Sequence, residues 1–128
     1  MPQRSHRTRF VIAAAFMLAA AGCGGGAATG DVDKIQVTLG QFDVIVANAA
    51  GRALFEVRVE IMPAGPASHF TNTVPRMENG EKRTLSHNRF TDRDNVPFSP
   101  RNVRVSGVVV TAKDIDGKTF RVELPWKQ

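Results

Sequence analysis

The chain has 128 residues and one cysteine, with 17 Lys and Arg against 12 Asp and Glu. This length suits a single folded domain, and one cysteine excludes an intramolecular disulfide framework. Three of the arginines lie in the first nine residues, and the near balance of charge in the remainder argues against a dedicated nucleic-acid-binding protein.

The first predicted element is an export signal over residues 1–22. Basic residues precede an uncharged apolar run from Phe10 to Ala21, and small residues stand directly before Cys23. A basic start, an apolar centre and a small-residue cleavage site are the parts of a signal peptide. The run of about twelve residues is shorter than the roughly twenty that a spanning helix needs. A permanent transmembrane helix is therefore not expected here.

The segment Ala20-Ala21-Gly22-Cys23 resembles the lipobox of bacterial lipoproteins. The resemblance implies cleavage between Gly22 and Cys23 and attachment of fatty acyl groups such as palmitate to Cys23. It also implies a lipid-anchored location in the bacterial cell envelope, outside the cytoplasm. Gly24, rather than an aspartate, follows the cysteine, which by the sorting rules of such lipoproteins favours the outer membrane where one exists. The alternative is a plain secretory signal with an incidental cysteine.

A flexible tether is predicted for residues 23–32. From Cys23 to Gly30 it holds only cysteine, glycine, alanine and threonine. Such residues cannot bury a core, and glycine costs more conformational entropy to order than any other residue. We expect the folded domain to cover residues 33–128 and to stay near the membrane.

From Lys34 onward apolar residues recur with a period of two, which predicts strands with one buried face. Weaker strands are expected at 70–74 and 82–86. The aromatic residues at inward positions are predicted to pack in the core. The inward sets are Ile35, Val37 and Leu39; Phe42, Val44 and Val46; Phe55, Val57, Val59 and Ile61; and Phe120, Val122, Leu124 and Trp126.

Turn and breaker residues separate these strands. Asn79-Gly80 and Asp116-Gly117 are dipeptides typical of hairpin turns. The alternation changes phase at Ser106-Gly107, which indicates a β-bulge or a crossing between sheets; alternatively, Val108, Val109 and Val110 are all buried in a central strand. Residues 91–101 are predicted to form a long loop pinned by Phe90 and Phe98.

The predicted fold class is all-β, an antiparallel β-sandwich of about seven strands following the signal and the Gly-rich tether. The strand spacing between Lys34 and Trp126 resembles that of immunoglobulin-like or fibronectin-like modules of bacterial envelope proteins. The Cys–Trp–Cys signature of immunoglobulin domains is missing. A small closed barrel is the structural alternative.

Few residues suggest catalysis or metal binding. His69 and His87 lie in different segments, and His87 is expected to be half-exposed at a strand end. Two acidic segments, 92–95 and 114–117, contain fragments of calcium loops, but neither completes the EF-hand pattern. A solvated loop and a hairpin turn are expected there instead. No Gly-x-Ser-x-Gly elbow is present, and we expect no enzymatic activity, metal or cofactor.

The leading hypothesis is a lipid-anchored envelope protein whose domain is a non-enzymatic binding or assembly module. Its expected partners are the membrane, through the lipid on Cys23, and another envelope protein, with no nucleic acid or small-molecule substrate. Loops on a rigid sandwich usually carry recognition. The candidate contact residues are accordingly His69, Phe90, Asp92, Asp94 and Phe98.

Two other hypotheses remain open. A metal-binding or hydrolytic protein, secreted or anchored, would use His69, His87, Asp92 and Asp94 together. A charge-based role near anionic headgroups would use the mildly basic stretch from Arg76 to Arg104.

Overall fold

The computed structural model describes residues 27–126, so the predicted signal segment, Cys23 and the first part of the predicted tether lie outside the described residues. The regular secondary structure of the described part is almost entirely strand, which confirms the all-β prediction. Its helical content is the 3₁₀ turn His87–Arg89, and no helix within it is long and apolar enough to cross a membrane. The strands are β1 (Thr29–Gly30), β2 (Ile35–Leu39), β3 (Asp43–Asn48), β4 (Leu54–Pro63), β5 (Phe70–Met77), β6 (Lys82–Ser86), β7 (Val105–Lys113) and β8 (Thr119–Pro125).

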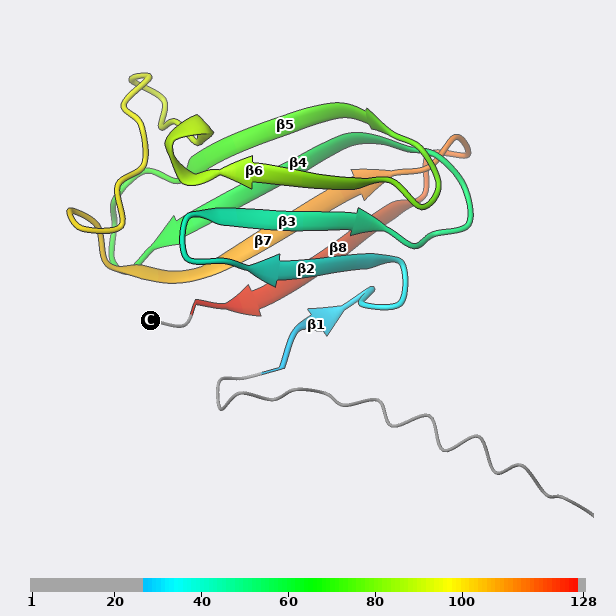
Figure 1. Cartoon of the computed structure of the whole chain (residues 1–128), viewed down its shortest axis with the longest axis horizontal. Helices are drawn as coiled ribbons and strands as arrows, with labels where there is room; N and C mark the ends of the chain where they lie inside the picture. Colours follow the sequence, from blue (N-terminus) through cyan, green and yellow to red (C-terminus); the bar gives the residue numbers. More distant parts are fainter. Residues whose placement is uncertain (1–26, 127–128) are drawn as a thin grey trace, which may run out of the picture.

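The strands form two antiparallel sheets that pack face to face. The larger sheet has the order β1-β8-β7-β4-β5, and the smaller has the order β2-β3-β6 (Figure 1). One hydrophobic core joins them, with Ile35, Val44 and Val46 from the small sheet and Val59 and Val110 from the large one. The two-sheet sandwich predicted from the strand spacing is therefore confirmed, with β1 as an additional short edge strand.

The prediction that Phe42 faces the core is wrong, because this residue is 71% exposed. Leu39 pairs with Val44, and the amide of Gly40 donates to the carbonyl of Asp43 over 2.8 Å. These contacts close a hairpin whose tip is Gln41 and Phe42. The alternation that buries Val44 and Val46 therefore ends at the turn.

The prediction that Phe55 faces the core is also wrong. Leu54 is buried in its place, and Phe55 is only partly buried. The register between β4 and β7 shifts between Phe55 and Arg58, which marks a β-bulge. Glu56 sits in the bulge with a φ of 50°. The extra residue reverses the faces of β4, so that Leu54 and Val57 both point inward.

The phase change predicted at Ser106-Gly107 is a bulge in β7. Val105 pairs with Pro63 and Gly107 with Met62, which leaves Ser106 without a partner residue in the ladder. Its hydroxyl donates instead to the Met62 carbonyl at 3.0 Å. Val108, Val109 and Val110 are also all buried, because β7 is the middle strand of the larger sheet. Both interpretations of this segment are confirmed.

Asn79-Gly80 forms the predicted turn, but the hairpin interpretation is wrong. Gly80 has a φ of 79°, yet β5 before the turn pairs with β4 and β6 after it pairs with β3. The buried amide of Asn48 holds this crossing by donating to the carbonyls of Met77 and Glu78, each at 3.1 Å. A tertiary anchor therefore overrides the local hairpin preference. Asp116-Gly117, in contrast, does join the hairpin of β7 and β8.

The end of the predicted tether belongs to the sheet. Thr29 pairs with Glu123 and Gly30 with Val122, and Ala28 packs against the core. Gly30 has a φ of 96°, and a Cβ atom there would overlap the Arg121 carbonyl oxygen. The Asp31 carboxylate then accepts the Arg121 amide at 2.8 Å. Among the described residues, the folded domain therefore includes residues 28–32, which were predicted to belong to the tether.

Candidate functional site

The sandwich has two ends of different character. We call the end formed by the connections 40–42, 64–69 and 87–104, with Trp126, the loop end; it lies at the left in Figure 1. The far end holds the connections 31–34, 49–53, 78–81 and 114–118. Hydrogen bonds join the loop-end segments, from the His87 amide to the Phe42 carbonyl at 2.9 Å and from the Ala64 amide to the Arg104 carbonyl at 2.9 Å.

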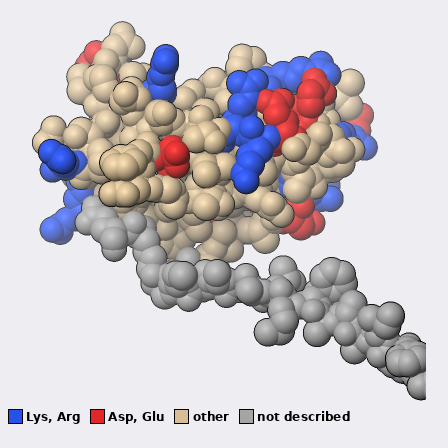
Figure 2. All heavy atoms as spheres, viewed as in Figure 1, with Lys and Arg blue, Asp and Glu red and all other residues tan. Residues whose placement is uncertain are grey.

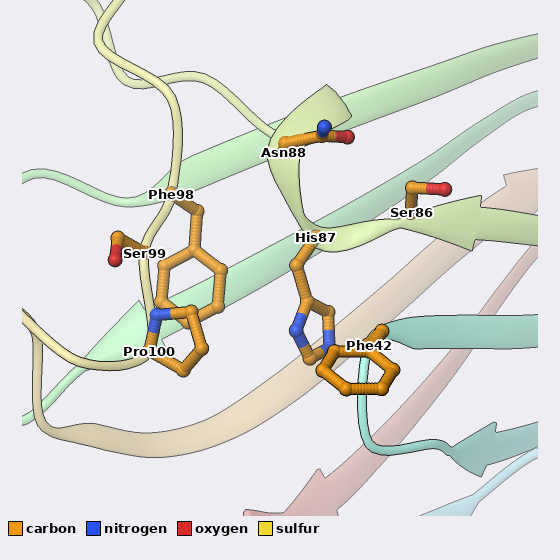
Figure 3. Close-up of a pocket in the computed structure, with 7 residues that line it drawn as sticks. All are labelled: Phe42, Ser86, His87, Asn88, Phe98, Ser99 and Pro100. Atoms are coloured by element: carbon orange, nitrogen blue, oxygen red, sulfur yellow. The ribbon is translucent and has the colours of Figure 1, made fainter.

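A shallow pocket of about 320 Å³ opens at the loop end. Figure 3 shows the rings of Phe42, His87, Phe98 and Pro100 gathered around it, while the side chains of Ser86 and Asn88 turn away. Its walls are thus mainly aromatic and apolar. This surface suits contact with an apolar group better than recognition of a charged small molecule.

His87 packs as a buried, uncharged ring. Its side chain is 6% exposed, and its ring centroid lies 5.5 Å from that of Phe98 and 5.4 Å from that of Trp126. Neither ring nitrogen has a hydrogen-bond partner among the described residues. Burial lowers the pKa of His87, and the nearby Asp43 opposes that shift only partly.

The expectation of a half-exposed His87 is therefore wrong. The alternation of β6 continues one residue past the strand, so that Leu85 points inward, Ser86 outward and His87 inward. The 3₁₀ turn that follows then closes over the ring. Because His87 stands two residues after Leu85, the period of two in the sequence indicates that both side chains face the core.

The predicted contact residues divide into core and surface. Phe90 is fully buried and Phe98 nearly so, and the Phe98 amide donates to the Phe90 carbonyl at 2.8 Å. These two residues pin the loop as predicted, and of the two only Phe98 lines the pocket. His69 is exposed, with its Nδ1 atom 3.1 Å from Glu60.

The two acidic segments are two copies of one turn. Oδ1 of Asp92 accepts the amides of Asp94 and Val96, each at 2.9 Å. Oδ1 of Asp114 likewise accepts the amides two and four residues on, at the same distance. The fourth residue of each turn has a positive φ, 61° at Asn95 and 80° at Gly117. These carboxylates hold their own loops, which explains the calcium-like spacing without a cation.

Within residues 27–126 no group of three His, Cys, Asp or Glu side chains is placed to hold a metal ion. His69 contacts Glu60, His87 lies among aromatic rings, and Asp92 holds its own loop. Three of the four residues of the metal-binding hypothesis, His69, His87 and Asp92, therefore contact separate partners.

The arginines divide sharply between ion-paired and unpaired side chains. Five of the described arginines lie within salt-bridge distance of a carboxylate, namely Arg52, Arg58, Arg76, Arg83 and Arg121. The described arginines without such a partner are Arg89, Arg93, Arg101 and Arg104, which are all exposed and all in the 87–104 segment. In Figure 2, blue and red spheres lie close together at the right, whereas most of the blue spheres at the left are surrounded by tan ones.

A simple rule in the sequence separates the two groups. Four of the paired arginines have a glutamate two residues away, which lies on the same side of a strand. Arg89, Arg93, Arg101 and Arg104 have no acidic residue at that spacing. The loop end therefore combines unpaired guanidinium groups with the exposed side chains of Phe42 and Val96, which are 71% and 52% exposed.

Comparison of the chain with protein-family models, with curated proteins and with solved structures gave no match. The functional assignment therefore rests on the residues and geometry of this chain.

Proposed function

We propose that this protein is a bacterial lipoprotein whose β-sandwich serves as a non-enzymatic binding or assembly module of the cell envelope. The observation that carries the proposal is the position of Cys23. It directly follows a segment with the parts of an export signal, and it precedes the first strand by only six residues. A thiol at that place would attach the folded domain to a bilayer.

Lipidation gives this arrangement a physical purpose. Each buried methylene of an acyl chain contributes about 0.8 kcal/mol to membrane affinity, and stable anchoring takes more than one chain. Lipoproteins of this kind carry a diacylglyceryl group and often a third acyl chain, which would hold the protein on the membrane. Gly24 favours the outer membrane where the organism has one.

We also propose that the domain is fibronectin-like rather than immunoglobulin-like in the strict sense. In constant-type immunoglobulin domains the fourth of seven strands joins the sheet of the first, second and fifth. Leaving β1 aside, the fourth strand here is β5, and it pairs with β4 in the opposite sheet. The strand order therefore favours the fibronectin-like member of the two resemblances.

The contact surface of the module is the loop end. It holds an apolar pocket, an exposed aromatic ring and unpaired arginines on loops fixed by a rigid sandwich. Aromatic residues and arginine are the side chains most enriched at the centre of binding surfaces.

Metabolic labelling tests the anchor. Cells that express the protein in the presence of labelled palmitate are expected to label the wild type and the conservative variant Ala21→Ser, but not Cys23→Ser. The mature polypeptide is expected to begin at Cys23. Equal labelling of Cys23→Ser, or a mature N-terminus elsewhere, would show that the protein is not a lipoprotein.

A further inference from the structure

We infer that the loop end rests on the bilayer to which the protein is anchored, with Arg89, Arg93, Arg101 and Arg104 contacting anionic lipid headgroups and Phe42 entering the interface. The inference deepens the proposed function, because it names the partner of the same loop end and uses the anchor at Cys23 to bring the two together. It also fixes how the module is oriented on the membrane.

The length of chain between Cys23 and the sheet restricts the domain to the membrane surface. Thr29 is paired with Glu123, so it moves with the sandwich. Six residue steps separate it from Cys23, and a fully extended chain spans at most about 20 Å over that distance. Whatever its conformation, the segment keeps β1 within one small-domain radius of the lipid.

The chain enters the sandwich on the side of the loop end. The first described residue, Ala27, lines a shallow hollow together with Met62 and Pro125, which lie at the loop-end termini of β4 and β8. From there β1 runs toward the far end. A short connection attached at this side places the loop end nearer to the anchor than the far end.

Charge complementarity points to the same surface. The loop end carries the four exposed arginines without carboxylate partners among the described residues, against two carboxylates, Asp92 and the exposed Asp94. One carboxylate oxygen of Asp92 is occupied by its own loop amides. The connections of the far end carry more carboxylates than cations, with Asp31, Asp33, Glu78, Glu81, Asp114 and Asp116 against Lys34, Arg52 and Lys118. An anionic membrane attracts nearby arginines over a Debye length of about 8–10 Å. The tether allows these side chains to come within such a range.

Apolar groups of the loop end complete an interfacial surface. Phe42 stands at the tip of a two-residue turn beside the pocket, and the exposed Val96 closes the 92–96 turn by pairing with Asp92. Large apolar side chains such as phenylalanine enter the boundary between headgroups and acyl chains when cationic residues flank them. Cationic side chains with an adjacent apolar tip are the pattern of proteins that bind membrane interfaces.

Vesicle binding of the unlipidated protein tests the surface separately from the anchor. The mature chain from residue 23 with Cys23→Ser contains every residue of the described core, whose members all lie between residues 28 and 126. It is expected to bind vesicles of phosphatidylcholine mixed with phosphatidylglycerol, to bind less as salt is added, and not to bind phosphatidylcholine alone.

Charge reversal at the two ends provides the matched comparison. Arg93→Glu with Arg101→Glu is expected to weaken partitioning onto the mixed vesicles by more than about tenfold, because each arginine near an anionic surface contributes about fivefold. Lys82→Glu with Lys118→Glu changes the net charge equally at exposed far-end positions and is expected to change partitioning by less than about threefold. Absence of binding at low salt, or equal losses in both variants, would overturn the inference.

Crosslinking in cells then distinguishes lipid from protein. A photoreactive side chain at position 42 of the lipidated protein is expected to give lipid adducts, and one at position 115, on the far end, is not. Adducts to protein alone at position 42 would assign the surface to an envelope protein and overturn the lipid contact. Each of these failures leaves palmitate labelling at Cys23 intact, so they are distinguishable from failure of the anchor.

Discussion

At the scale of single residues, the ring nitrogens of His87 are buried without a hydrogen-bond partner among the described residues. A buried donor or acceptor left without a partner costs about 1–3 kcal/mol. The ring nevertheless contributes apolar area between Phe98 and Trp126, and it forms one wall of the pocket. The two effects oppose one another at the same site.

Replacement of His87 by phenylalanine separates these effects. His87→Phe keeps a ring of similar shape and removes both unpaired nitrogens, so the free energy of unfolding is expected to rise by about 1 kcal/mol at neutral pH. Chemical denaturation with the intrinsic Trp126 fluorescence measures it. A loss of stability would show that the nitrogens have partners in solution.

The pH dependence of stability gives an independent test of His87. Burial lowers its pKa from the ordinary value of 6.5, so the unfolded chain binds more protons than the native state just below that pH. The contribution of the neutral ring is fully present above 6.5 and is lost as the pH falls toward the native pKa. His87→Phe is expected to remove this decline, while His69→Ala should retain it. Asp43, the charged neighbour, must be kept in both variants.

At the scale of elements, the same aspartate-to-alanine substitution is expected to change the free energy of unfolding by different amounts in the two turns. Asp114 is buried, and its carboxylate also contacts Arg52 at 3.5 Å, whereas Asp92 is partly exposed and makes only the two amide contacts. Asp114→Ala is expected to destabilise the domain by about 2–3 kcal/mol and Asp92→Ala by about 1 kcal/mol. Urea midpoints measure both.

Calcium provides the control for these turns. Because Oδ1 in each turn already accepts two amides, millimolar calcium is expected to leave the melting temperature of the wild type unchanged. A rise in melting temperature that Asp92→Ala or Asp114→Ala abolishes would instead establish a cation site.

The elements also show which parts of the fold follow from local sequence. Alternation located the strands because each has one buried face, and Ser106-Gly107 marked its bulge through a change of phase. Glu56 gave no such signal, since Leu54, Phe55 and Val57 are all apolar and either register looks consistent. The sheet assignment around Asn79-Gly80 depended on Asn48, some thirty residues away. Local patterns carry no information about such a distant hydrogen bond.

At the scale of the whole molecule, the contact surface was only partly predictable. The basic character of residues 76–104 is visible in the sequence, but the division into neutralised and unpaired arginines requires knowing that the glutamates two residues away share a strand face. Alternation alone predicted that Phe42 lies in the core, but the turn between β2 and β3 places this residue on the surface. The loops that meet at one end come from three separate connections, which the sheet topology brings together.

The length of the tether depends on one small residue. Gly30 combines a φ of 96° with a backbone contact that leaves no room for a Cβ atom, so Gly30→Ala is expected to detach β1 from β8. Detachment would lengthen the free segment from about 20 Å to roughly 40 Å, because folded structure would then begin near Ile35. The amides of Arg121 and Glu123, which face β1, would lose protection against hydrogen exchange, and a protease would cleave near Thr29.

Gly65→Ala is the matched control, because Gly65 has a similar φ of 93° but nothing within 4 Å of an added Cβ atom. It carries the same backbone strain, about 1 kcal/mol, without the clash. Both variants should remain folded, since β1 contributes only the edge of the larger sheet. If Gly30→Ala keeps the protection of the Arg121 and Glu123 amides at the level of Gly65→Ala, then β1 tolerates a side chain at this position. The short connection would in that case not depend on glycine.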